Sequence, residues 1–166
     1  MRTSQPRIVV GFSRSAASAA ALLWALHEAR EHGTAVVAVH AWQWSGESRA
    51  SYAPMDTWRC RDDELRAVRQ SAERAIADLV PDPAARLAVT TVVEQGPAVQ
   101  VLLRHAEGAE LLVLGSRPYD PDLPAPMGPV LAACLPRASC PVVVVTPEMA
   151  RPALTPAFAG TRPPAA

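Results

Sequence analysis

The sequence contains no lysine and no asparagine, so its 16 basic side chains are all arginine. Without lysine, the chain has no group for a Schiff base, a phosphate-loop ammonium or a lysine general base, and mechanisms that need one are excluded. Acidic residues also number 16, which gives a formal net charge of zero. This balance argues against a protein that binds nucleic acid or an anionic membrane by bulk electrostatic attraction.

Cysteine and histidine are scarce and lack the spacing of metal ligands. Cys60, Cys134 and Cys140 are odd in number and form no CxxC pair, so we expect reduced thiols, one or two of them buried, and no disulfide framework or zinc site. The four histidines form no HxxxH or HExxH pair. Each is expected to be a surface or packing residue unless a pocket holds it.

No segment resembles an export signal or a membrane span. Residues 1–7 are polar, and the first apolar run after them is short. The most apolar helical stretch, Ala16–Ala29, contains His27 and Glu28 and is too short and too polar to cross a bilayer. We therefore expect a cytoplasmic protein with no membrane partner.

Five short apolar runs predict β-strands that are buried on both faces. Each is rich in valine, isoleucine or leucine, a pattern typical of the strands of a parallel sheet. The runs are Arg7–Phe12, Thr34–Ala41, Arg86–Glu94, Glu110–Gly115 and Pro141–Thr146.

Four helical patterns alternate with these strands. The first begins after Ser13 and Ser15, which can cap it, and is closed by Gly33. The second has an acidic first turn, and proline stands at the start of the third. The expected helices cover residues 15–32, 62–80, 97–106 and 128–136.

The alternation predicts an α/β fold, a doubly wound five-stranded parallel sheet with helices on both faces and right-handed crossovers. Ligands of such Rossmann-like folds bind at the carboxyl ends of the strands, here after Phe12, Ala41 and Gly115. We expect one domain over residues 1–147 and a disordered tail, rich in proline and alanine, over residues 148–166.

A polar loop of about fifteen residues follows the second strand, and loops of this length are usually functional or mobile. Four aromatic residues lie in or beside this loop, and we expect them to line the core beneath it rather than to stack on a planar ligand. They are Trp42, Trp44, Tyr52 and Trp58.

Three well-known doubly wound classes do not fit. The turn after the first strand has one glycine, so it lacks the GxGxxG of dinucleotide-binding domains. A receiver domain needs a lysine and acidic residues that the chain lacks, and the GxSxG of serine hydrolases is absent.

Five motifs in series resemble the universal stress protein family. They are Ile8–Ser18, Ala21–Ala29, Gly96–Ala98, Ala109–Arg117 and Ser139–Val145. The resemblance covers residues 6–147 and implies a fold like that of the adenine nucleotide alpha-hydrolases. It also implies a role in stress adaptation and, for the members that hold ATP, a site with a defined motif.

That motif consists of an aspartate after the first strand and, after the fourth, Gly-x-x-Gly, nine residues, then Gly-Ser or Gly-Thr. This chain has Gly115 and Gly128 at the required separation, but Ser13, Pro118 and Pro129 occupy the other three positions. The resemblance therefore implies a vestigial ATP site. Its candidate residues are Gly11, Ser13, Ala41, Gly115, Ser116, Arg117, Gly128 and Val130.

These replacements act against a triphosphate. Proline has no N–H to donate to a phosphate oxygen. Asp120 and Asp122 add negative charge, and at ~4 Å and an effective dielectric of about 20 each would cost roughly 4 kcal/mol before screening. The dipole at a helix N-terminus stabilises a nearby negative charge by only about 0.3–1 kcal/mol. Arg14 and Arg117 would partly neutralise an anion, so a modified nucleotide site stays open as the alternative.

We therefore expect a non-catalytic regulatory or interaction domain in stress adaptation, with no ATP held and no catalytic residue or metal. The alternative is an ATP-binding sensor, for which slow hydrolysis is not excluded. The last strand, Val142–Val145, lies at a sheet edge, where it would pair in a homodimer unless the tail covers it. The other expected partner is a protein that the sequence does not identify.

Overall fold

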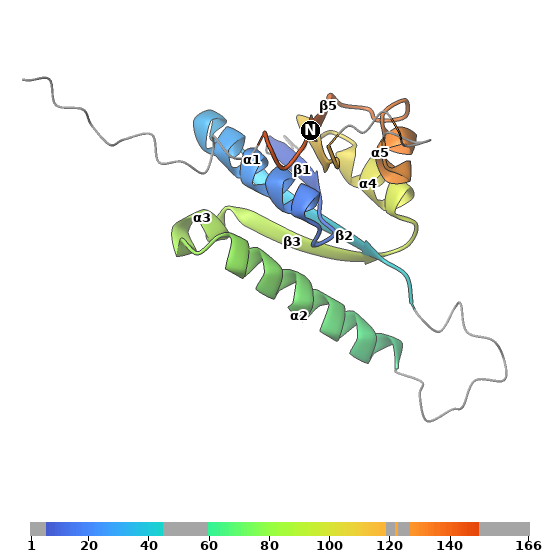
Figure 1. The fold of residues 1–166 in the computed structure, drawn as a ribbon. Coiled ribbons are helices and arrows are strands. Elements are labelled where there is room, and N and C mark those ends of the chain that lie inside the picture. The colour runs from blue at the N-terminus through green and yellow to red at the C-terminus, as the bar shows by residue number, and fades with distance from the viewer. Residues whose placement is uncertain (1–5, 45–59, 119–121, 123–126, 150–166) are drawn as a thin grey trace, which may run out of the picture.

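The computed structural model describes residues 6–44, 60–118, 122 and 127–149, which fold into five strands and five helices (Figure 1). The loop over residues 45–59, with Tyr52 and Trp58, and the tail beyond Met149 lie outside the described residues. In chain order the elements are β1 (Arg7–Gly11), α1 (Ala16–His32), β2 (Ala35–Trp42), α2 (Arg61–Leu79), α3 (Pro83–Leu87), β3 (Val89–Gln95), α4 (Ala98–Ala106), β4 (Leu111–Gly115), α5 (Pro129–Cys134) and β5 (Val142–Val145).

The strands form one parallel sheet in the order β3-β2-β1-β4-β5. The central strand β1 is paired on both sides, with Val9 opposite Val37 and Leu112. Helices α1 and α2 pack on one face of the sheet and α4 and α5 on the other (Figure 1). The predicted doubly wound fold is confirmed.

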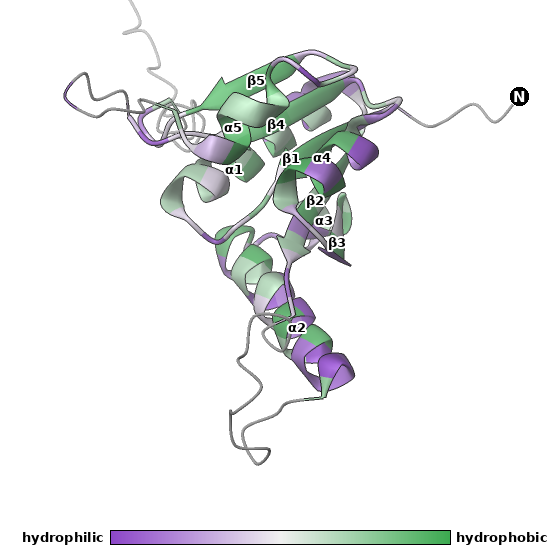
Figure 2. Ribbon diagram, turned by 90° about the vertical axis from the view of Figure 1, so that its right-hand side faces the viewer, coloured by the Kyte–Doolittle hydropathy of each residue, from purple (hydrophilic) through white to green (hydrophobic). Residues whose placement is uncertain are grey.

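Two apolar clusters hold these layers together. Alternate side chains of β1 point to opposite faces, so Ile8 and Val10 pack against α1 while Val9 packs against α4. All three are at most 1% exposed. Figure 2 shows the hydrophobic strands at the centre and the hydrophilic outer end of α2. A strand buried on both faces must be apolar at every position, which is why β1 is a continuous apolar run.

Helix α1 lies close to the sheet because its buried side is built mainly of alanine. Ser15 caps its first turn by accepting the N–H of Ser18, and Gly33 ends it in the left-handed region, at φ 67°. From the 3–4 spacing of its apolar residues, Ala19, Leu22, Leu26 and Ala29 would form the packing face, but Ala19 and Leu26 are only half-buried. The buried side of α1 comprises Ser18, Ala20, Ala21, Leu22, Ala25 and Ala29.

The strand predicted to begin at Arg86 begins instead at Val89, because a short helix precedes it. The Asp82 carboxylate accepts the N–H of Ala84 and caps α3, whose first residue is Pro83. The Arg86 side chain turns back to the end of α2 and donates to the Val80 carbonyl over 3.1 Å. The Asp82 cap and the Arg86 contact favour a helix here more strongly than the apolar residues from Arg86 onward favour a strand.

The cysteines differ in exposure. Cys60 is exposed, Cys134 is buried and Cys140 is half-buried. Burial raises the pKa of both the Cys134 and the Cys140 thiols above the ordinary value, which favours the neutral, unreactive form. Within the described ranges, no helix is long and apolar enough to cross a membrane, and no three metal-ligating side chains gather.

Candidate functional site

A cleft of about 160 Å³ opens at the carboxyl ends of β1, β2 and β4. Here the crossovers change direction between β1 and β4, the position where doubly wound sheets bind ligands. The start of α1 and residues of α4 and α5 complete its walls. Its lining comprises Gly11, Phe12, Ser13, Ser15, Ser18, Val39, His40, Ala41, Ala98, Leu102, Leu114, Gly115, Val130 and Leu131.

Five of the eight candidate residues line this cleft, namely Gly11, Ser13, Ala41, Gly115 and Val130. The other three candidate residues are not part of the lining. Ser116 is 9% exposed and directly follows β4, and its N–H donates to the Val145 carbonyl over 2.8 Å. Its hydroxyl donates to the Arg117 carbonyl over 3.0 Å. Gly128 is the N-cap residue of α5 and, like Arg117, is not part of the lining.

Sequence reasoning missed two polar residues of the cleft, His40 and Ser18. His40 was expected to be a packing residue unless a pocket held it, and it lines the cleft. Its Nδ1 lies 2.8 Å from the carbonyl oxygen of Phe12, so this nitrogen carries the proton and donates. Both residues stand inside apolar runs, so their sequence context is that of packing residues. Only their position beside the end of β1 in the folded structure shows that they line the cleft.

Ser18 organises the turn between β1 and α1. Its hydroxyl accepts the N–H of Ser13 over 3.2 Å and donates to the carbonyl of Ser15 over 3.0 Å. Its own N–H donates to the Ser15 hydroxyl over 3.1 Å. The side chain is 3% exposed, so these bonds form away from bulk water. An N–H group that could face an anion in the cleft is thus already bonded within the turn.

We expect Ser18→Ala to lower the free energy of unfolding by about 1–3 kcal/mol, since the N–H of Ser13 would lose its acceptor. Urea denaturation measures the effect. The matched control is Ser13→Ala, which removes only an exposed hydroxyl contact to Ser15 and should change stability by less than about 0.5 kcal/mol. Equal losses in the two variants would contradict this role for Ser18.

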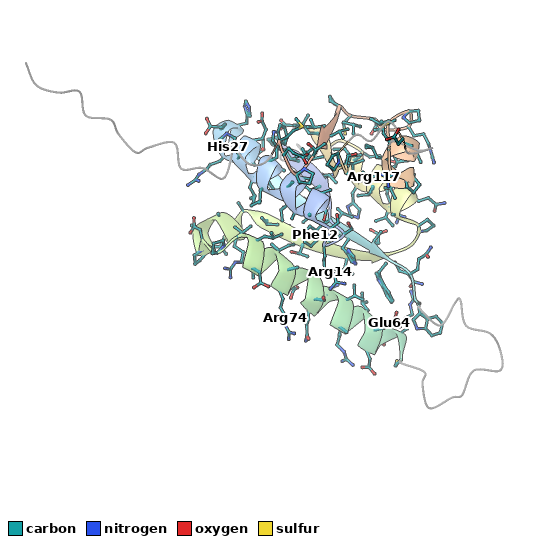
Figure 3. All side chains as sticks on the ribbon, in the orientation of Figure 1. Phe12, Arg14, His27, Glu64, Arg74 and Arg117 are labelled. Atoms are coloured by element: carbon teal, nitrogen blue, oxygen red, sulfur yellow. The ribbon has the colours of Figure 1, made fainter. Side chains whose placement is uncertain are left out.

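Arg14 occupies the middle of the same turn and has a left-handed backbone, at φ 62°. In the described part of the chain it is the one residue other than glycine with positive φ, a conformation that costs an L-residue roughly 1–2 kcal/mol. Its guanidinium donates to the Ser71 hydroxyl over 2.7 Å, and Figure 3 shows Arg14 between the sheet and α2. The turn at the cleft is therefore tied to α2.

Gly115 lets β4 approach α1 at the base of the cleft. A Cβ at this position would lie 2.3 Å from both the carbonyl carbon and the carbonyl oxygen of Ala17, which are backbone atoms. The space is needed because α1 packs directly on the end of β4. Gly128 differs, since a Cβ there would meet nothing within 4 Å and its φ is −63°. Only the first of these two motif glycines is required by packing.

Two described positions from the end of β4 to the first residue of α5 are prolines. Pro118 follows β4 closely, and Pro129 is the first residue of α5. Neither has an N–H group. Asp122 is described, and the rest of residues 119–126 lies outside the described residues.

Comparison with known proteins connects this geometry to one family. A family model described as the universal stress protein family matches residues 6–146. The sequence has no match among curated proteins.

Solved structures share the fold at low identity. A universal stress protein family member from Burkholderia pseudomallei is 21% identical over 87% of this chain and 98% of its own, with a TM-score of 0.60. A universal stress protein in complex with cAMP is 18% identical over 87% and 98%, with a TM-score of 0.56. A family protein from Arabidopsis thaliana with AMP bound is 15% identical over 85% and 91%, with a TM-score of 0.54.

Proposed function

The chain belongs to the universal stress protein family, and we propose that it is a non-catalytic regulatory domain of stress adaptation that does not hold ATP. The observation that carries the proposal is that three backbone positions of the family's phosphate motif have no N–H free to bind a phosphate of ATP. Pro118 and Pro129 have no N–H, and the N–H of Ser13 is bonded to the Ser18 hydroxyl.

The size and lining of the cleft also favour this function. Its volume of about 160 Å³ is well below the roughly 300–1,000 Å³ of typical small-molecule sites. Most of the described residues that line it are apolar, and none of these is an arginine or a carboxylate. Catalysis would need an activated nucleophile or an acid–base pair there, and the serines of the turn bond to one another instead.

We expect millimolar Mg-ATP to leave the melting temperature of the protein unchanged. A ligand present at 100 times its dissociation constant would add ~2.7 kcal/mol and raise that temperature by several degrees. Differential scanning fluorimetry makes the comparison, with buffer containing magnesium alone as the control. Calorimetric titration that gives a low-micromolar dissociation constant for ATP would contradict the proposal.

The second candidate function is that of a sensor for an adenine nucleotide. It is favoured by the structural neighbours in complex with cAMP and with AMP, ligands that carry one phosphate and need fewer donors than ATP. In this chain Ser13 and Ser15 line the cleft, and their hydroxyls would exchange the bond between them for bonds to such a phosphate. A melting temperature that rises with AMP and not with ATP would favour this function over the first.

We also propose that β5 pairs with a second copy of the chain. It is an edge strand of four valines, of which Val142, Val143 and Val144 are only half-buried. An uncovered apolar edge favours strand pairing. Light scattering should give twice the chain mass of 17.6 kDa, and a monomer at micromolar concentration would disprove the pairing.

A further inference from the structure

A second and larger cavity lies at the amino ends of the strands, at the other end of the sheet from the cleft. It is a groove of about 490 Å³ between the second half of α1, the end of α2 and α3 (Figure 1). Its lining includes Leu23 and Leu26 of α1 and Leu79 of α2, and all three are only half-buried. Ala84 and Ala85 of α3 form the opposite side. The groove is therefore an apolar surface that stays partly exposed.

Helix α3 presents a second apolar surface beside this groove. Leu87 is 89% exposed, more than any other large apolar side chain in the described ranges. Pro83 and Ala84 are exposed as well, and the one polar residue of α3, Arg86, turns back to the Val80 carbonyl. A helix at a protein surface normally turns polar side chains to the solvent. The apolar exposed side of α3 therefore indicates an interaction surface.

Leu87 lies at the rim of the groove and does not fill it. Ala85 and Ala88, close to it in the chain, line the groove, whereas Leu87 is not part of the lining. At 3.6 residues per turn, its side chain leaves α3 about a third of a turn away from the groove. An exposed side chain beside a groove is self-complementary, because two copies related by a two-fold axis can each insert it into the groove of the other.

The charges of the groove are self-complementary in the same way. Besides His27, the lining contains one arginine and one carboxylate, Arg30 and Asp82. Both are exposed, and neither forms an ion pair with a described residue. One oxygen of the Asp82 carboxylate accepts the N–H of Ala84, and the other oxygen can accept from a partner. Across a two-fold axis, Arg30 of each copy would pair with Asp82 of the other, so a balanced lining favours a second copy.

We propose that the groove and α3 form a two-fold contact between two copies of the chain, in which Leu87 of each copy fills the groove of the other. The groove is complete only in the pair, since the second copy supplies the leucine. Helix α3 has five residues and offers a small surface, and contacts that bury less than about 1,200 Å² are weak and reversible. We therefore expect a dissociation constant of about 50 µM.

This contact is separate from the proposed function and from the proposed pairing of β5. It uses no residue of the cleft. Strand β5 is at one edge of the sheet, and β3, which directly follows α3, is at the other. The two contacts between copies can therefore form or fail independently.

Analytical ultracentrifugation of the full chain between about 1 and 500 µM tests the proposal. The weight-average mass should rise by a factor of about 1.8 or more over this range. The rise starts from one chain mass if β5 does not pair and from two if it does, so the two contacts are distinguished. A mass that does not change up to about 500 µM would overturn the proposal.

Leu87→Ala should abolish the rise in mass. Each pair loses two buried leucines, so association should weaken at least a hundredfold. The melting temperature at low concentration should not change, because Leu87 is exposed in the single chain. The matched control is Leu135→Ala, which changes a leucine that is 38% exposed at the end of α5, on the opposite face of the sheet. Equal association of the two variants would overturn the proposal.

Arg30→Gln and Asp82→Asn test the ion pair between copies. Asparagine preserves the cap of α3. Each substitution should weaken association about fivefold, and the double variant should be no weaker than either, because all three lack the same ion pair. Arg30 and Asp82 do not pair within the chain, so this coupling would arise between copies. Effects that multiply in the double variant would overturn the pairing.

Hydrogen exchange at the amides of residues 84–88 distinguishes the other occupants of the groove. Protection should increase with protein concentration in the unaltered chain and not in the Leu87→Ala variant. Equal protection at all concentrations would show that the chain covers its own groove, for example with residues 150–166. Unprotected amides at about 500 µM would leave the groove to a different protein. Either result would overturn the proposal.

Discussion

Gly115→Ala is expected to destabilise the domain by about 3 kcal/mol or more, enough to leave much of the protein unfolded at 37 °C. The new Cβ would lie 2.3 Å from the carbonyl carbon and oxygen of Ala17 and 2.7 Å from the amide nitrogen of Ser18. These are backbone atoms inside α1, so no side-chain rotation relieves the overlap. The end of β4 would have to move away from α1 and open the core between them.

Urea denaturation followed by circular dichroism measures this effect. Gly128→Ala is the matched control, since it changes the other motif glycine where a Cβ has no neighbour within 4 Å. Its free energy of unfolding should stay the same or rise by about 0.4–1 kcal/mol because the unfolded chain loses freedom. Gly11→Ala should be intermediate, since its closest contact, at 2.7 Å, is the end of the Leu114 side chain. A Gly115→Ala protein as stable as the Gly128→Ala protein would contradict the packing described for β4.

Ser13→Asp, Pro118→Gly and Pro129→Ser, combined, are expected to create ATP binding. Two prolines would be replaced by residues with an N–H, and serine would add a hydroxyl at the start of α5. Two charge-assisted hydrogen bonds at about 1.5–3 kcal/mol each add ~3–6 kcal/mol, or roughly 10²–10⁴ in the dissociation constant. Calorimetric titration with Mg-ATP should then show a micromolar dissociation constant where the unaltered protein shows none.

Ser13→Asp alone is the control, because it supplies the aspartate of the family motif and no new backbone donor. It should not bind ATP. If the triple variant folds with an unchanged melting temperature and still does not bind ATP, the missing donors are not the reason that the unaltered protein fails to bind ATP. If the unaltered protein binds as tightly as the triple variant, the proposed loss of ATP binding is wrong.

The order of the elements could be predicted from the sequence because each element carries a local signal. The run Ile8–Val10 of β1 is apolar at consecutive positions because β1 is covered on both faces. Ser15 and Gly33 mark the two ends of α1 through contacts within a few residues. The prediction failed at Pro83–Leu87, where capping by Asp82 and the Arg86 contact to Val80 make a helix of residues next to a strand.

The cleft was less predictable, because residues far apart in the sequence meet there. The candidate positions Ser116, Arg117 and Gly128 were inferred from a motif, and they lie outside its lining. His40 is part of the lining because β2 lies beside β1 and brings its ring to the Phe12 carbonyl. Nothing within the apolar run that contains His40 indicates that contact.

The sequence by itself determined the absence of lysine chemistry, the alternation of strands and helices, and the prolines at two positions of the family's phosphate motif. These are properties of residue types and of short spacings, which the chain carries whether or not it is folded. Only the tertiary structure decided that Gly115 must lack a side chain and that His40 donates to the Phe12 carbonyl. Each of these depends on the distance between two elements after packing, and that distance is set by the whole fold.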